Sequence, residues 1–314
     1  MSRTRISAII PTMNRPALLE QALASIRRVE GPDLEVEIIV SDNEPSTDVE
    51  AITHAFHGAY VRATTPGPGA ARNAGALAAT SEYLTFLDDD DLWLPTHVRT
   101  HLKLLEAHPR LAAVIGQNVG VDMSLKNVGP PHPMSLLDPA DMFRSLLAVV
   151  PQIGSVVVRH SAWNAVGPFD ESLLAAEDWD WFLRLALRCR VVFITVPCIM
   201  HRSRPFSRAE DPIIEMYRRY TLHVFWLNVR RAGLARLPPH VTVRMWLRRV
   251  GYFAGKFLVS AQVHASNDDH EAARRAFGLA ARASALHTVW QLIRSASLRR
   301  AAWEAFFDSP TPQS

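Results

Sequence analysis

The first 200 residues alternate short apolar runs with amphipathic segments, and this alternation constrains the fold more than any other feature of the chain. Short apolar runs are typical of buried strands, and apolar residues at helical spacing are typical of helices that cover a sheet. The pattern predicts an α/β domain with a mostly parallel sheet flanked by helices. We expect strands at 6–10, 36–40, 59–63, 83–87, 111–115, 155–159 and 191–196. We expect helices after Pro16 and at 70–79, 95–107 and 178–190.

After His201 the strand pattern stops, and helical periods follow near 212–232, 241–264, 268–284 and 288–306. Charge divides at the same place. Residues 1–200 hold 16 Lys and Arg against 23 Asp and Glu, whereas residues 201–314 hold 18 against 8. The net charge of +3 therefore joins an acidic body to a basic helical region.

Composition excludes several classes of protein. With 314 residues, of which 48% are hydrophobic and 21% charged, the chain can bury one large core or two smaller ones. Two cysteines are too few for a disulfide framework and have no zinc-finger spacing, which favours a cytoplasmic location. No apolar run reaches the ~18 residues of a membrane span, and the N-terminus is unlike a signal peptide.

Four aspartates at 88–91 directly follow the expected strand at 83–87. Adjacent carboxylates repel each other, so a compact fold tolerates them mainly beside a cation or in solvent. Oxygen ligands on a loop suit Mg²⁺ or Mn²⁺, and the competing interpretation is a solvated acidic turn before the next helix.

Polar groups also follow the first two strands. Pro11, Thr12, Asn14 and Arg15 offer backbone amides and a guanidinium for phosphate, and Asp42 offers a carboxylate to a base or ribose. Ligands of open parallel sheets bind beyond the carboxyl ends of the strands. The sequence therefore predicts a nucleotide site at this edge.

Four segments together resemble the family 2 glycosyltransferases, whose fold is the Rossmann-like GT-A fold: SAIIPTMNRPALLEQALASI, IIVSDNEPSTD, GPGAARNAGALAATSEYLTFLDDDDLW and VGPFDESLLAAEDWDWFLRLA. The resemblance covers residues 5–205. It implies an inverting, metal-dependent transferase that moves a sugar from a nucleotide-diphospho-sugar to an acceptor hydroxyl. UDP is the expected nucleotide, and dTDP and GDP are the alternatives.

The resemblance also assigns donor-side roles. Thr12 and Asp42 would bind the nucleoside, and Arg72 would bind the base or diphosphate region. In the DxD motif, Asp88 would face the ribose or sugar and Asp90 the metal, with Asp89 between them; a shift of the motif to Asp89 and Asp91 is the alternative.

A second acidic centre lies at the start of the helix expected at 178–190. By resemblance Asp178 is the general base and Glu177 positions the acceptor, whereas the structural alternative is helix-start electrostatics. Trp179 and Trp181 would give a sugar-stacking surface, against the alternative of core residues. Asp170, in a turn before this centre, is structural or acceptor-side.

His201 is a candidate metal ligand, against the alternative of a hydrogen-bonded structural histidine. Where the family commonly has Tyr-Arg-x-His, this chain has His201, Arg202, Ser203 and Arg204. The contact to the diphosphate is therefore open between His201, Arg202 and Arg204.

In the helix expected at 241–264, one face is apolar and the other carries Arg244, Arg248, Arg249 and Lys256. A basic surface suits peripheral contact with a membrane that carries a lipid-linked acceptor, and the alternative is a solvated face of a packed helix. No nucleic-acid reader motif accompanies the arginines.

The sequence thus predicts a GT-A catalytic domain at 1–205, with a nucleotide-sugar half at 1–115 and an acceptor half at 116–205. A basic helical extension follows at 206–314. The expected activity is hexosyl transfer to a saccharide or lipid-linked acceptor in the synthesis of cell-surface polysaccharide or glycoconjugate. Two alternatives are a non-catalytic nucleotide-sugar scaffold and a nucleotidyl or phosphoryl transferase, but the chain has no P-loop.

Overall fold

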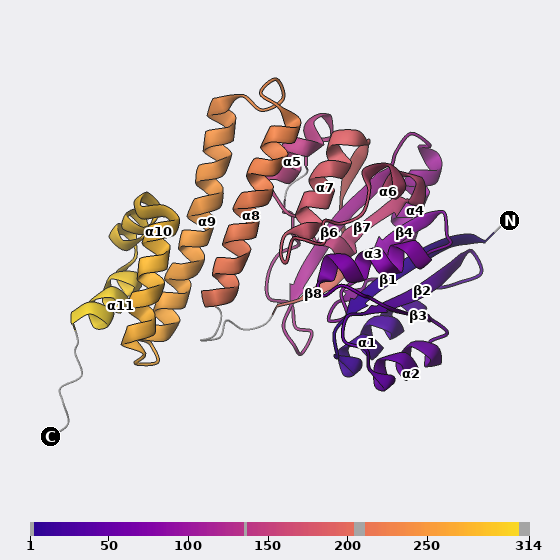
Figure 1. The fold of residues 1–314 in the computed structure, drawn as a ribbon, viewed down its shortest axis with the longest axis horizontal. Helices are drawn as coiled ribbons and strands as arrows, with labels where there is room; N and C mark the ends of the chain where they lie inside the picture. Colours follow the sequence, from indigo (N-terminus) through magenta and orange to yellow (C-terminus); the bar gives the residue numbers. More distant parts are fainter. Residues whose placement is uncertain (1–2, 135–136, 204–210, 308–314) are drawn as a thin grey trace. The chain divides into compact units, whose positions relative to one another are not determined.

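The computed structural model describes residues 3–134, 137–203 and 211–307 (Figure 1). The chain divides into two compact units, Met1–Arg204 and Pro205–Ser314. The first unit contains the sheet, and among the described residues of the second unit every regular element is a helix.

The first unit is built on one mixed sheet with the strand order β3-β2-β1-β4-β7-β6-β8-β5. The pairs β1/β2, β1/β4, β2/β3 and β6/β8 are parallel, and β4/β7, β6/β7 and β5/β8 are antiparallel. The strands are β1 Thr4–Thr12, β2 Leu34–Asp42, β3 Ala59–Arg62, β4 Tyr83–Phe86, β5 Leu92–Trp93, β6 Ala113–Val121, β7 Val156–Arg159 and β8 Val191–Arg202. This is the α/β architecture that the alternation predicts.

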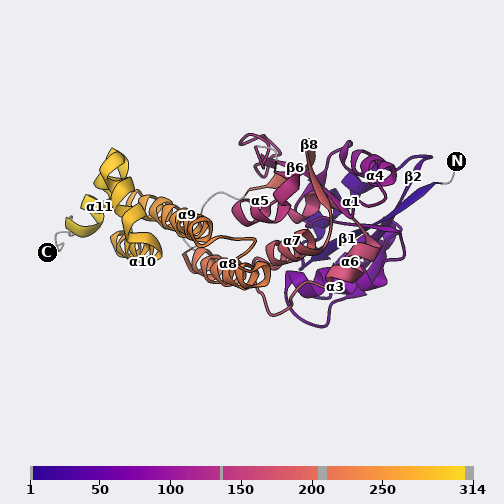
Figure 2. The ribbon, with the colours of Figure 1, turned by 90° about the horizontal axis from the view of Figure 1, so that it is seen from above.

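Helices cover both faces of the sheet, as Figures 1 and 2 show. The helices are α1 Pro16–Arg27, α2 Thr47–Ala55, α3 Pro68–Ala78, α4 His97–Ala107, α5 Met142–Ala148, α6 His160–Val166 and α7 Glu177–Arg188. Apolar residues of α1, α2 and α4 pack in one core with Ile6, Ala8 and Ile10 of β1. On the opposite face α3 lies so close to β1 that a side chain at Gly75 would run into Ile9.

Several elements differ from the sequence expectation. The strands β6 and β8 are longer than predicted, because they continue to pair beyond an irregularity where Gln117 faces Pro197. A glycine and a proline near that point look like strand ends in the sequence. Four short elements, α2, β5, α5 and α6, were not predicted, since each has too few residues for a clear period.

The second unit comprises α8 Asp211–Ala232, α9 Pro239–Ala265, α10 His270–Arg294 and α11 Ala296–Phe307. Its core is made of small and aromatic residues, among them Phe253, Phe257, Ala273 and Phe277. The break expected between 284 and 288 is a kink inside α10 at Ser284, where φ is −163° and ψ is 99°. In the described part of the chain, none of the helices is both long enough and apolar enough to cross a bilayer.

Candidate active site

The three polar strand ends meet at one edge of the sheet. Thr12 and Asp42 are direct partners in the parallel pairing of β1 and β2, and β4 pairs with β1 on the other side. The aspartates at 88–91 follow β4 and therefore reach the same edge. The edge that the sequence predicted as the binding edge is thus assembled by the register of the strands.

Asp42 is fully buried at this edge, and Pro11 beside Thr12 is buried as well. The Asp42 carboxylate accepts hydrogen bonds from the backbone amides of Glu44 and Ser46 at 3.0 and 3.3 Å and from the Tyr60 hydroxyl at 2.9 Å. These three donors fix the orientation of the carboxylate.

The four aspartates divide into an exposed pair and a buried pair. The side chains of Asp88 and Asp90 keep 29% and 22% of their surface accessible, whereas those of Asp89 and Asp91 keep 0% and 2%. The segment is a turn in which the Asp91 amide donates to the Asp88 carbonyl at 3.0 Å, and the buried pair is the one that meets Arg15 and His201. The buried pair holds the segment in the fold and the exposed pair faces outward.

Arg15 ties the strand end of β1 to the aspartates. Its guanidinium lies 2.5 Å from an Asp89 oxygen and 2.7 Å from Asp90 Oδ2. The Thr12 hydroxyl donates to Asp89 at 2.6 Å. Burial raises the pKa of Asp89 to about 6, although Thr12 and Arg15 both lower it. Asn14, one residue before Arg15, has a φ of 49°, a backbone conformation that asparagine tolerates.

Asp91 is held from the other side by β8. One of its oxygens lies 3.1 Å from Nδ1 of His201, and the other accepts from the backbone amide of Arg202 at 2.9 Å. Nε2 of His201 lies 2.9 Å from the amide nitrogen of Gln152. Burial lowers the pKa of His201, but the hydrogen bond and charge of Asp91 outweigh it, so the pKa lies above its ordinary value. Arg204 lies outside the described residues.

Arg72 joins the aspartates to the second acidic centre. It is buried, and its two terminal nitrogens donate to Asp88 at 2.7 Å and to Glu177 at 2.6 Å. Glu177 is 105 residues away from Arg72 in sequence. One guanidinium on α3 therefore brings together the motif after β4 and the start of α7.

Asp178 follows Glu177 at the start of α7 and is half-buried. Burial and then the charge of Glu177 raise the pKa of Asp178 to about 7, although Arg72 lowers it. Ala176, just before the pair, has a left-handed backbone with φ of 62° and ψ of 19°. A residue with a Cβ pays roughly 1–2 kcal/mol for that conformation, and such strain clusters at functional sites.

With this geometry established, comparisons with known proteins decide the family. The model of the family "Glycosyl transferase family 2" matches residues 7–170, which is more than half of the chain. The chain belongs to the family 2 glycosyltransferases. The match includes the three strand ends and stops before Glu177, so the second acidic centre is assigned by its position alone.

Two relatives of this glycosyltransferase are similar over part of their length. An uncharacterized glycosyltransferase of Haemophilus influenzae is 25% identical over 57% of the chain and 61% of its own length. The GalNAc(5)-diNAcBac-PP-undecaprenol beta-1,3-glucosyltransferase of Campylobacter jejuni is 38% identical over 28% of the chain and 30% of its own length. The chain thus spans less than two thirds of each of these relatives.

Solved structures support the fold. S. aureus TarS 1–349 in complex with UDP-GlcNAc superimposes with a TM-score of 0.55 at 17% identity, over 88% of this chain and 91% of that one. The mannosyltransferase PcManGT of Pyrobaculum calidifontis, in complex with GDP-Man and Mn²⁺, gives a TM-score of 0.57 at 19% identity, over 98% and 89%. At these identities the likeness shows the GT-A fold.

The two tryptophans after Asp178 are core residues of the glycosyltransferase. Trp179 and Trp181 are 1% and 0% exposed, and their indole nitrogens donate to the backbone carbonyls of Leu146 and Gly167. Trp181 packs in an aromatic cluster with Phe86, Trp163 and Phe169. Of the two interpretations that the sequence offered, the core one is confirmed and the sugar-stacking one is not, because both rings face the interior.

Asp170 and Asn73 hold the turn before α7. The sequence indicated a structural or acceptor-side role for Asp170 and did not single out Asn73. Asp170 accepts from the amide and hydroxyl of Ser172 within its own turn. Asn73, the residue after Arg72, accepts from the amide of Phe169 at 2.8 Å and donates to its carbonyl at 3.0 Å. An asparagine inside the apolar helix pattern was the one sequence signal for this contact.

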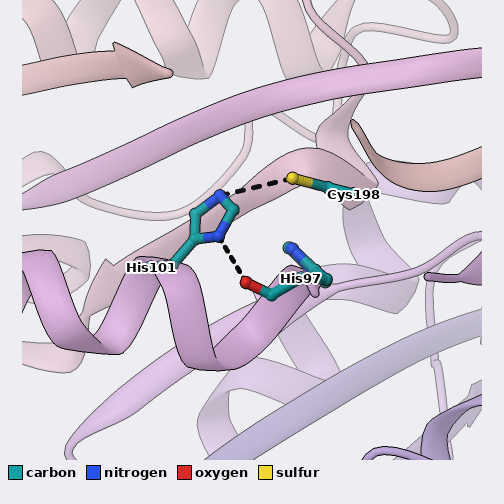
Figure 3. Close-up of side chains that lie close together, drawn as sticks. All are labelled: His97, His101 and Cys198. Atoms are coloured by element: carbon teal, nitrogen blue, oxygen red, sulfur yellow. Dashed lines mark hydrogen bonds between the residues drawn. The ribbon is translucent and has the colours of Figure 1, made fainter. Parts of the chain in front are cut away.

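The structure also brings His97 and His101 of α4 together with Cys198 of β8, as Figure 3 shows. Their ligand atoms lie within 4.8 Å of one another, and all three residues are buried. Nδ1 of His101 lies 2.6 Å from the His97 carbonyl, and the thiol donates to the Val196 carbonyl. Burial lowers the pKa of His101 to about 4 and raises that of Cys198 to about 12. We interpret the cluster as a neutral hydrogen-bonded layer of the core.

Proposed function

We propose that this family 2 glycosyltransferase is an inverting enzyme that transfers a sugar from a nucleotide-diphospho-sugar to an acceptor hydroxyl in a single displacement. The observation that carries the proposal is the Arg72 bridge. It places Asp88 of the donor edge and Glu177 of the second acidic centre on one buried guanidinium. The donor groups and a base with a pKa of about 7 thereby share one site.

For the donor, the strand ends supply the binding groups. Asp42 and Thr12 would recognise the nucleoside, and the backbone at Pro11 and Asn14 with the Arg15 guanidinium would approach the phosphates. Arg72 would contact the diphosphate, and Asp89 would act by holding Thr12 and Arg15. UDP is the nucleotide we favour, because TarS is described in complex with UDP-GlcNAc; GDP is the alternative, because PcManGT is described in complex with GDP-Man.

A divalent cation fits the exposed pair of the DxD motif. Asp88 and Asp90 offer carboxylate oxygens to solvent, whereas the alternative pair, Asp89 and Asp91, is buried. Asp90 would hold Mg²⁺ or Mn²⁺, with His201 as the second ligand once Nε2 gives up its contact with Gln152. The bound cation would supply positive charge to the diphosphate leaving group. In the structure the Arg15 guanidinium pairs with Asp90. When the cation binds, it must replace at least part of this ion pair.

For the acceptor, Asp178 is the general base. Its carboxylate takes the proton of the acceptor hydroxyl while that oxygen forms a bond to the anomeric carbon of the donor sugar. The bond from the same carbon to the diphosphate oxygen breaks, and the nucleoside diphosphate leaves with the electron pair. A pKa of about 7 suits this role, since the base is ionised near neutral pH and still accepts a proton.

The acceptor we favour is a saccharide carried on a polyprenyl diphosphate or a related lipid. The Campylobacter relative is named for an acceptor of that kind. A reaction on such a substrate would take place at the cytoplasmic face of a membrane, and the two free cysteines of the chain agree with a reducing compartment.

The test combines donor binding with turnover. Thermal shifts with UDP-sugars, with and without Mn²⁺, should show a metal-dependent rise in stability that Asp90→Ala removes. Asp178→Asn should keep that rise and lose transfer. Asp122, whose carboxylate accepts hydrogen bonds within its own turn, gives a matched control, Asp122→Asn, that keeps both. Turnover by Asp178→Asn equal to that of the natural chain would place the base elsewhere. Binding without any transfer by the natural chain would instead support a scaffold.

A further inference from the structure

The second unit carries an apolar helix face that is turned away from its core. After the kink at Ser284, α10 presents Leu286, Val289, Trp290 and Ile293 at the spacing of one helix face. Their exposed fractions are 82%, 55%, 48% and 69%. A globular helix normally buries such a stripe, so the position of this one needs a reason.

The inward face of the same segment is mostly polar, and Leu292 is its apolar residue against the unit's core. Thr288 is the buried residue of this stretch, and its hydroxyl donates to the Ser284 carbonyl at 2.9 Å. The ring of His287 packs against Gly251 of α9 at a distance that leaves little room for a Cβ there. Before the kink the order is the usual one, with Ala273, Ala276 and Phe277 in the core. After the kink, most of the large apolar residues of α10 therefore face outward.

Charge indicates what covers the exposed stripe. Residues 282–304 contain four arginines and one acidic residue, Glu304, which pairs with Arg300 at 2.7 Å. All four, Arg282, Arg294, Arg299 and Arg300, are exposed. The Arg294 guanidinium lies over the Trp290 ring at 4.7 Å, so a cation and an indole are presented together. Arg282 and Arg294 lie on α10 with the stripe, and Arg299 and Arg300 lie on α11 just after it. A tryptophan and aliphatic side chains with arginines nearby are the composition of an element that lies in a membrane interface.

We propose that residues 285–294 of α10 dock on a bilayer surface that contains anionic lipid, with the apolar stripe in the interface and the arginines at the headgroups. The helix expected at 241–264 is a poorer candidate. The apolar residues Val250, Ala254, Phe257 and Leu258 of its stripe are buried in the unit's own core. The observations on α10 support membrane docking without reference to the proposed function. Only the purpose of the docking, to bring a lipid-linked acceptor within reach, rests on that function.

Vesicle sedimentation of the full chain tests the proposal without donor or acceptor. The probes are vesicles of phosphatidylcholine alone and of phosphatidylcholine with phosphatidylglycerol. We expect binding to the anionic vesicles, and the double variant Trp290→Ser/Ile293→Ser should lower the partition coefficient by about tenfold or more. The matched control is Leu77→Ser, because Leu77 is 87% exposed on α3 of the other unit; it should leave binding unchanged.

Charge and folding are checked separately. Arg282→Gln/Arg294→Gln should weaken binding to the anionic vesicles several-fold and make it less sensitive to salt. Thermal melting shows whether each variant folds, and Leu286→Ser/Val289→Ser replaces the first pair if that pair does not. Equal partitioning of the double variant and the natural chain would overturn the proposal. So would a dimer, seen by light scattering, that the double variant dissociates in the absence of vesicle binding.

Failure of vesicle binding leaves the thermal shift with UDP-sugars unaffected, so the two proposals fail by different measurements.

Discussion

Replacing Asp178 by asparagine should stabilise the folded protein at alkaline pH while it removes transfer. Burial and Glu177 raise the pKa of Asp178 from 3.8 to about 7, against the influence of Arg72. The folded state therefore holds a proton that the unfolded state releases. Asparagine has nearly the same shape and carries no charge, so it is relieved of this cost.

The sign and size of the effect follow from the linkage of protonation to folding. Between about pH 4 and pH 7 the folded state binds more protons, so stability falls as pH rises through this window and is constant above it. A shift of about three units corresponds to about 4 kcal/mol at most. Because Asp178 is half-buried and water screens its charge, we expect about 2 kcal/mol.

Calorimetric melting of both proteins at pH 5 and pH 8 measures this difference. About 2 kcal/mol corresponds to about 4–8 °C in a unit of this size, so the variant should melt that much higher at pH 8. The difference in melting temperature between the variant and the natural chain should be less than half as large at pH 5. Asp122→Asn is the control of opposite sign, since hydrogen bonds from Ser124 and Lys126 lower the pKa of Asp122.

A variant that melts lower than the natural chain at pH 8 would refute the reasoning, because it would show that Arg72 stabilises an ionised Asp178. A gap that does not change with pH would refute it too. In the natural enzyme, kcat/KM should rise with pH through about 7, as the base loses its proton.

Three further predictions concern packing. Arg72→Met should lower the free energy of unfolding in urea by about 3–5 kcal/mol, because it strands a buried carboxylate; an unchanged midpoint would contradict the bridge. Trp181→Ala should cost about 3–5 kcal/mol in the same assay with little change in acceptor KM, whereas a stable variant with a raised KM would restore the sugar-stacking interpretation. Gly116→Ala should cost about 1–3 kcal/mol, since its Cβ would collide with Cys198 Sγ; Cys198→Ala in the same chain should recover part of that loss, and full additivity would count against the contact.

The local sequence pattern was enough to predict that helices cover the sheet of the first unit. It was also enough to predict the edge of the sheet at which the polar strand ends meet. Apolar runs of strand length with helical segments between them predict a sheet covered by helices, because each element must bury its apolar face. Thr12, Asp42 and the aspartates at 88–91 follow three of those runs. Parallel strands end at a common edge, so placing these residues together required only their order.

The sequence pattern was not enough to predict which of the four aspartates are buried and which are accessible. Their burial depends on Arg15, which approaches from the start of α1, and on His201, which approaches from the end of β8. Identical residues in a row carry no signal of which of them will meet these distant partners. The register of the DxD motif was therefore open in the sequence, and the exposed pair in the structure supports Asp88 and Asp90.

The same reason applies to Trp181 and to α10. An aromatic residue beside an acidic pair suits a sugar site or a core equally well, and the packing of Phe86 and Phe169 around the ring decided for the core. In α10 the helical period was plain, but a kink at one serine determined which side of it meets the neighbouring helix. Sequence periodicity specifies that a face exists, because it reflects bonds within one element. Which face is buried depends on contacts between elements, and those only the tertiary structure decided.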